Sequence, residues 1–103
     1  MTIVSDNYDN QYCDFFCFKN GKTVTIQFNA TVEKNVPHDT WTTIANISEI
    51  YRPQFLLAMV YYSVLTNHGI LQVTPQGDIM LLPKNHDLDA GDYLALCFTY
   101  VVA

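Results

Sequence analysis

Residues that can pair with the hydroxyl groups of a sugar gather in three short stretches of the sequence. Carboxylate, amide and imidazole groups form such hydrogen bonds, and an aromatic face covers the C–H groups of a sugar ring. Each stretch also contains Gly or Pro, so all three are expected in loops. An ordinary role in a turn, or in the core for the Trp, stays open for each residue. The candidates for a saccharide-binding site are His38, Asp39, Trp41, Asn67, His68, Asn85, His86 and Asp87.

No catalytic or metal-binding pattern accompanies these candidates. The sequence has no G-x-S-x-G elbow, and its four glycines are isolated instead of forming a phosphate-binding loop. The three histidines lie in expected loops and lack the spacing of metal ligands. Asn85, Asp87 and Asp89 alternate like the start of a calcium loop, but Ala90 stands where such a loop needs Gly. We therefore predict no catalytic residue, no metal and no cofactor.

Composition and charge exclude several classes of partner. The 103 residues suit one domain, and ten acidic residues against five Lys and Arg give a net charge of −5. A binder of nucleic acid or of an anionic membrane surface needs a basic patch. The start of the chain has no basic region followed by a long apolar run, so no signal peptide is expected, and the apolar run 55–65 is too short for a membrane helix. We expect neither nucleic-acid binding nor membrane insertion.

Three cysteines give an odd count without a C-x-x-C pair. A chain of this size has enough core to fold without a disulfide framework. Cys13, Cys17 and Cys97 are therefore expected to be free, buried thiols.

Short segments with the texture of β-strands recur about every ten residues, separated by Gly, Pro and Asn turns. Residues 23–33 alternate strictly between apolar and polar types, as in a strand with one wet face. Asn20-Gly21, just before this strand, favours a type I′ hairpin turn. The pattern predicts an all-β fold, an antiparallel β-sandwich that is jelly-roll-like. Residues 1–11 are expected to be a linker or lead-in and residues 12–103 a single domain. The expected strands are 12–18, 23–33, 41–47, 55–65, 70–74, 79–82 and 93–102.

Two of these segments, 55–65 and 93–102, are apolar on both faces. One face of each is expected in the core, and part of the other is expected to meet a neighbouring subunit, because interfaces are poor in charge and rich in aromatic residues. The sequence does not say which face is which, and a helix over 53–65 remains the alternative. The candidates for an oligomer interface are Met59, Val60, Tyr61, Tyr62, Tyr100 and Val102.

A series of short motifs then follows in a familiar order. They are Trp41-Thr-Thr-Ile-Ala45, Tyr51-Arg52-Pro53, Gly69-Ile-Leu-Gln-Val73, Gly77-Asp78-Ile79 and a last strand with Tyr93 and Tyr100. Over residues 20–103 this order resembles the C-terminal head domains of phage tail fibres and baseplate receptor-binding proteins. The chain departs from that pattern at Ser48, where Pro is common, and at Gln76-Gly77, which replaces Asp-Gly.

The resemblance implies a homotrimeric knob that belongs to the virion and is assembled in the host cytoplasm. Its implied partners are a host cell-surface saccharide and other tail or baseplate proteins, and its implied function is non-catalytic host adhesion. Three alternatives stay open. The first is a structural element that trimerises or caps a tail or baseplate. The second is a C1q-like or carbohydrate-binding module of a bacterial surface protein, and the third is a glycan-cleaving enzyme. The last would need a carboxylate pair from Asp39, Asp87, Asp89 and Asp92.

Overall fold

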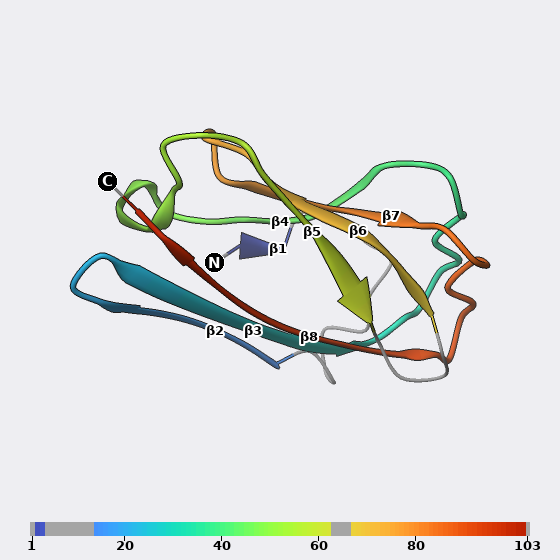
Figure 1. Cartoon of the computed structure of the whole chain (residues 1–103). Coiled ribbons are helices and arrows are strands. Elements are labelled where there is room, and N and C mark those ends of the chain that lie inside the picture. Colours follow the sequence, from blue (N-terminus) through green and yellow to red (C-terminus); the bar gives the residue numbers. More distant parts are fainter. Residues whose placement is uncertain (1, 4–13, 63–66, 103) are drawn as a thin grey trace.

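Two antiparallel sheets face each other in the computed structural model, which describes residues 2–3, 14–62 and 67–102 (Figure 1). The five-stranded sheet contains, in spatial order, β1 (Thr2–Ile3), β4 (Thr42–Asn46), β7 (Asp78–Pro83), β6 (His68–Val73) and β5 (Leu57–Tyr62). The three-stranded sheet contains β2 (Asp14–Asn20), β3 (Thr23–Thr31) and β8 (Tyr93–Val101). A 3-10 turn, η2 (Glu49–Tyr51), lies between β4 and β5. The all-β antiparallel sandwich predicted from strand spacing is confirmed.

The core lies between the two sheets and is formed by every second side chain of the strands. Every second residue of β3, beginning with Val24, is buried, and the intervening residues face outward. β8 does the same, and its Phe98 is paired with Ile26 of β3. The facing sheet contributes Leu71, Ile79 and other aliphatic side chains. Burial of these apolar side chains is the main force that holds the two layers together.

The β2–β3 hairpin forms where it was expected, but its turn is of another type. Asn20 pairs with Thr23, so Gly21 and Lys22 are the two central residues. Gly21 has a φ of +62°, whereas Lys22 is not among the residues with positive φ. A type I′ turn needs positive φ at both central positions, while a type II′ turn needs it only at the first. The type I′ prediction is therefore wrong, because Asn20 still belongs to the strand.

The apolar segment 55–65 forms strand β5 and not a helix. The strand begins at Leu57, and its described part alternates: Leu57, Met59 and Tyr61 face the core, whereas Val60 and Tyr62 face outward. Val60 is 68% exposed and Tyr62 is 75% exposed. Residues 63–65 of the predicted strand lie outside the described residues.

Close backbone packing explains Gly69 in β6. A Cβ atom on this residue would lie 2.0 Å from the carbonyl oxygen of Leu82 in the neighbouring strand. On the other side Gly69 pairs with Tyr61 of β5, so an aromatic residue stands opposite the glycine.

The Arg-Pro motif closes the sandwich at the end where β4 leads into β5. Arg52 Nε donates to the carbonyl oxygen of Ile47 at 3.0 Å. Gly77 has a φ of +90°, and a Cβ there would lie 2.6 Å from Arg52 Nε. Tyr100 adds a hydrogen bond from its hydroxyl group to the carbonyl oxygen of Tyr51 at 2.6 Å. Several motif residues are therefore accounted for by their contacts at this junction.

Some expectations concern residues at the chain start and the cysteines. Thr2–Ile3 pair with β4, and residues 4–11 of the expected lead-in lie outside the described residues, as does Cys13. Cys17 is a free, half-buried thiol whose pKa is raised by burial. Cys97 is also free but exposed, which corrects the expectation of a buried thiol, because it lies on the outward face of β8. The described residues include no helix with the length and hydropathy needed to span a membrane.

Candidate glycan-binding site

All eight candidate ligand residues lie at one end of the sandwich. They come from the β3–β4 connection, from Asn67 and the first residue of β6, His68, and from the β7–β8 connection, which lie at the same end because consecutive antiparallel strands alternate in direction (Figure 1). The β3–β4 and β7–β8 connections are joined by a two-residue bridge. Val36 N donates to the oxygen of Leu88 at 2.8 Å, and Leu88 N donates to the oxygen of Val36 at 3.0 Å.

The carboxylate of Asp87 accepts several hydrogen bonds from the β3–β4 connection. It accepts hydrogen bonds from Asn35 Nδ2 at 3.1 Å and from the backbone N–H of His38 at 2.8 Å. The His38 ring also contacts it through Nδ1. The hydrogen bond from the His38 ring, followed by the other two donors, lowers the pKa of Asp87 to about 2. The same contact raises the pKa of His38 above its ordinary value. Asp87 and His38 therefore carry opposite charges under mildly acidic conditions.

A second ionic contact joins the same two loops. Lys84 Nζ lies 2.7 Å from Asp39 Oδ1, and this hydrogen bond lowers the pKa of Asp39. The backbone of Asp39 has a φ of +56°, in the left-handed region that Asp tolerates better than most residues. Its N–H donates to the oxygen of Pro83 at 2.8 Å. Both acidic candidates therefore already have cationic partners within the site.

The side chain of Asn67 is buried beneath the loops, where it links β5 to the β7–β8 connection and is not available to a ligand. Its side chain is 1% exposed. Its Oδ1 accepts from the hydroxyl group of Tyr61 at 2.8 Å, and its Nδ2 donates to the carbonyl oxygen of His86 at 2.9 Å. Burial also raises the pKa of Tyr61, which keeps this hydroxyl group protonated. Asn67 was predicted as a ligand residue, but its position in the structure is that of a buried link between β5 and the β7–β8 loop.

The remaining candidates form the exposed rim. His86 and Asn85 are exposed, and Asn85 Oδ1 accepts from the backbone N–H of His68 at 3.0 Å. His68 is half-buried, with its ring 5.5 Å from the ring of Tyr62. Trp41 is 37% exposed, so this aromatic residue is partly accessible. Hydroxyl-binding groups and an aromatic face are thus present at one end of the molecule.

Asp39 and Asp87 differ from the acid that a glycosidase needs. A glycosidase needs one carboxylic acid with a raised pKa to protonate the leaving group. Asp39 and Asp87 instead have lowered pKa values. Asp92 accepts the backbone N–H of Asp89 at 2.9 Å and so stabilises a turn. The described residues contain no group of three His, Cys, Asp or Glu side chains that is arranged to hold a metal ion.

Comparison with solved structures gives a match over the whole chain. The crystal structure of the head domain of phage bIL170, reported in the context of a common fold for the receptor-binding domains of lactococcal phages, superimposes with a TM-score of 0.69. The match covers 100% of this chain and 96% of that chain, and the two sequences are 11% identical. The chain has a phage receptor-binding head-like fold. No family model matches the sequence, and a search of curated proteins gives no match. The resemblance inferred from the motifs is thereby confirmed for the fold.

Within this head-like fold, the candidate interface residues divide between two faces. Tyr61, Tyr100 and Val102 are buried, and Met59 is half-buried against the core. Only Val60 and Tyr62 are exposed, since they occupy the outward positions of β5.

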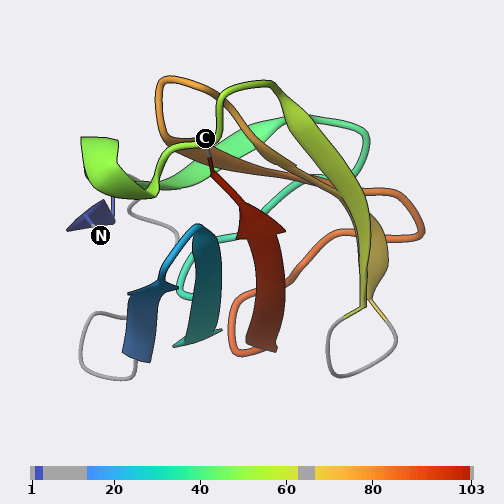
Figure 2. The ribbon, with the colours of Figure 1, turned by 60° about the vertical axis from the view of Figure 1, so that its left-hand side comes forward.

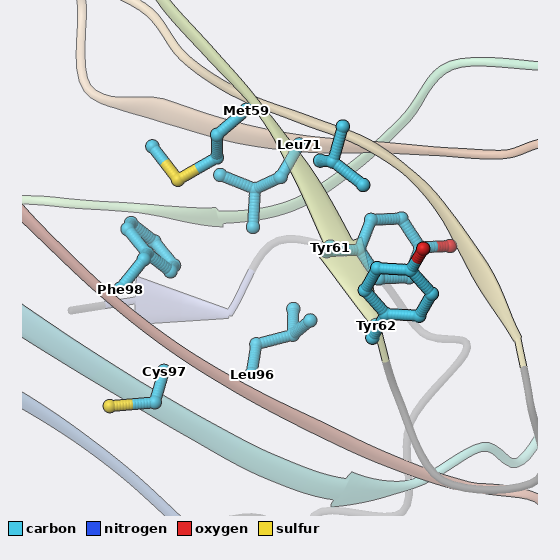
Figure 3. Close-up of a pocket in the computed structure, with 8 residues that line it drawn as sticks. Met59, Tyr61, Tyr62, Leu71, Leu96, Cys97 and Phe98 are labelled. Atoms are coloured by element: carbon cyan, nitrogen blue, oxygen red, sulfur yellow. The ribbon is translucent and has the colours of Figure 1, made fainter.

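A pocket of about 120 Å³ opens between β5 and β8. In Figure 3, Met59, Tyr61 and Leu71 project toward Leu96 and Phe98 across it. Its wall is therefore formed mainly by side chains of the core. The pocket lies between β5 and β8, which are edge strands of the two sheets.

The structure adds two residues to the candidate site that were missed in the sequence. Lys84 balances Asp39, and Asn35 supports Asp87. Both occur in the same polar stretches as the candidates, but their roles depend on contacts between loops about 50 residues apart. The choice of sugar-binding residue types left out Lys84, and nothing in the local sequence of Asn35 points to its contact with Asp87.

Proposed function

We propose that this chain is a non-catalytic receptor-binding head of a phage tail fibre or baseplate, which holds a host cell-surface polysaccharide at its loop end. The observation that carries the proposal is the match of the whole chain to the head domain of phage bIL170. The clustering of exposed polar side chains at one end supports the position of the site.

Charge supports a polar, uncharged ligand at this end. Asp39 and Asp87 already contact Lys84 and His38, so neither needs a cation from the ligand. His86 and Asn85 carry exposed hydrogen-bonding groups. Hydroxyl groups both donate and accept hydrogen bonds, so a saccharide is complementary to such a mixture.

We propose further that the head is a homotrimer carried on the virion. Val60 and Tyr62 are the interface candidates with exposed side chains, and they stand beside Ile70 and His68 of β6. Exposed aromatic and aliphatic side chains without charge are typical of the centre of a protein interface. Tyr62 lies against His68 of the loop end, with ring centroids 5.5 Å apart, so this interface would adjoin the binding site.

Binding to intact cells tests the adhesion proposal. The labelled protein is incubated with a panel of bacterial strains that includes lactococci, and with polysaccharide extracted from each strain that binds. We expect His86→Ala and Asp39→Ala to lower the affinity at least tenfold. Gln54→Ala, an exposed polar position outside the loop end, serves as the matched control and should bind as the parent does. Equal binding by all four proteins would refute the loop site, and no binding to any strain would refute adhesion.

A structural capping role is the second candidate, and the exposed Val60 and Tyr62 side chains favour it. This role predicts assembly without any cell binding. Variants of His86 that assemble normally but no longer adsorb to cells would exclude it.

A further inference from the structure

The outer face of the three-stranded sheet carries two exposed phenylalanines. Phe16 and Phe18 of β2 are each 64% exposed. The strands β2, β3 and β8 lie side by side, as Figure 2 shows. The register sets a series of outward rows across them, and three adjacent rows form what we call the Phe face: Phe16–Gln27–Cys97, Phe18–Thr25–Thr99 and Asn20–Thr23–Val101. All nine side chains are exposed except Thr25, which is half-buried.

The geometry of the Phe face is suited to an extended polymer of sugar rings. Two residues along a strand correspond to about 6.6 Å, so the two rings stand in line along β2. The neighbouring strand is about 4.8 Å away and presents the amide of Gln27 beside Phe16 and the hydroxyl group of Thr25 beside Phe18. Thr25 and Thr99 are 3.2 Å apart between their hydroxyl oxygens. A row of aromatic faces thus runs parallel to a row of amide and hydroxyl groups.

The charge of the Phe face limits the kind of ligand that can bind there. None of the nine residues of the Phe face is charged, while the whole chain carries −5. An anionic polymer would be repelled by the protein and would find no Lys or Arg on this face. A cationic partner would find a single acidic residue, Asp14, and that residue lies in the row beyond Phe16, at the margin of the face. The face is therefore complementary to an uncharged polymer that has both C–H surfaces and hydroxyl groups.

The outer face of the opposite sheet differs in composition. Its rows Val60–Ile70–Leu82 and Ala58–Gln72–Met80 are mainly aliphatic, and its exposed aromatic ring, Tyr62, stands at the end of β5 against His68. Aliphatic side chains have no ring face on which to stack a sugar, and they suit a protein interface. The two outer faces of the sandwich are thus equipped for different partners.

We propose that the Phe face is a second glycan-binding site, in which a neutral polysaccharide lies along β2 with its sugar rings on Phe16 and Phe18. Its hydroxyl groups pair with Gln27 and Thr25. This site is separate from the loop end, because the loop end is formed by other connections at the ends of the strands.

Affinity electrophoresis in gels containing cellulose derivatives, soluble chitin, β-1,3-glucan or galactan tests the proposal. The parent protein should be retarded by at least one of these neutral polymers. The double variant F16S/F18S should lose at least tenfold in affinity, whereas F16Y/F18Y, which keeps both rings, should stay within about threefold of the parent. Ile50→Ser, a similarly exposed apolar residue on η2, is the matched control and should not change binding.

Two further measurements, an NMR titration and the mass of the assembly, distinguish glycan binding on the Phe face from binding at the loop end and from subunit contact. Backbone amide shifts of the parent protein, followed by NMR during titration with the retarding polymer, should change on β2 and β3 and not in the loops 34–41 and 84–92. This result does not depend on cell adhesion, so it stands even if the loop site fails. The proposal is overturned if no neutral polymer retards the parent, if F16S/F18S binds as the parent does, or if that variant lowers the mass of the assembly, which would make the face a protein interface.

Discussion

Replacing Asn67 tests whether a buried hydrogen-bond link holds the candidate binding loops in place. Asn67→Ala removes the acceptor of the Tyr61 hydroxyl group and the donor to the His86 carbonyl oxygen. Tyr61 is 5% exposed, so its hydroxyl group would lose a partner without gaining full access to water. An unpaired buried polar group costs about 1–3 kcal/mol. His86 is exposed, so its carbonyl group regains water, and we expect a total loss of about 2 kcal/mol of unfolding free energy.

Urea unfolding followed by circular dichroism at fixed protein concentration measures this loss. For a slope of about 1–2 kcal/mol per molar urea, the midpoint should fall by about 1–2 M. Tyr61→Phe should cost about 1 kcal/mol, because it leaves only the Asn67 oxygen without its donor. The double variant should be less destabilised than the sum of the two, by about 1 kcal/mol, since the orphaned group of each single variant is then absent. Gln54→Ala, an exposed polar residue outside the link, is the control and should stay within about 0.5 kcal/mol of the parent.

Two results would refute this reasoning. A loss below about 0.5 kcal/mol for Asn67→Ala would mean that the buried link contributes nothing to stability. Strict additivity of the two substitutions would mean that the Tyr61 hydroxyl group and Asn67 do not act on each other. A confirmed link predicts in addition that Asn67→Ala weakens saccharide binding at temperatures well below its melting point, because His86 is no longer held.

The remaining predictions concern packing, assembly and pH. Gly69→Ala should cost about 3 kcal/mol or more in thermal or urea unfolding, because its Cβ would lie 2.0 Å from a backbone oxygen; a loss below about 1 kcal/mol would contradict the packing of β6 on β7. Val60→Asp should lower the mass of the assembly in light scattering while the circular dichroism spectrum stays unchanged, since Val60 is 68% exposed; unfolding instead would place it in a core. In an NMR titration His38 should show a midpoint above 6.5, and Asp87→Asn should bring it back toward 6.5. Because the folded pKa of His38 is raised, its contact with Asp87 is complete below about 6.5 and weakens as pH rises through the folded value. The lowered pKa of Asp87 gives a second limit, since the contact is lost as pH falls from about 4 toward 2.

The strands could be predicted from the sequence because successive side chains of a strand alternate between the core and the solvent, so apolar and polar residues alternate too. The alternation from Thr23 onward identified β3 and its buried face, and the Gly and Pro turns identified the order of the other strands. The polar stretches at 38–41 and 85–87 could also be assigned to loops, whereas His68, expected in a turn, is the first residue of β6. Local chemistry decided the features that were predicted correctly.

Pairing between distant segments was decided only in the tertiary structure. β5 is apolar on both faces, so its sequence does not say that Tyr61 faces the core and Tyr62 faces outward. Its register with β6 fixes the direction, because paired residues lie on the same face and Met59 is paired with the buried Leu71. The separation of the candidate interface residues into exposed and buried members follows from this choice.

The sequence by itself determined that this protein is an all-β sandwich with most of the candidate ligand residues in loops. The structure decided that these candidates lie at one end, that Asn67 is a buried support and not a ligand residue, and that Lys84 belongs beside Asp39. It also decided that Phe16 and Phe18 lie next to Gln27 and Thr25 on an outer face. The physical reason is the same in each case: residue type and period depend on the local chain, whereas hydrogen bonds and shared faces depend on which distant strands pair.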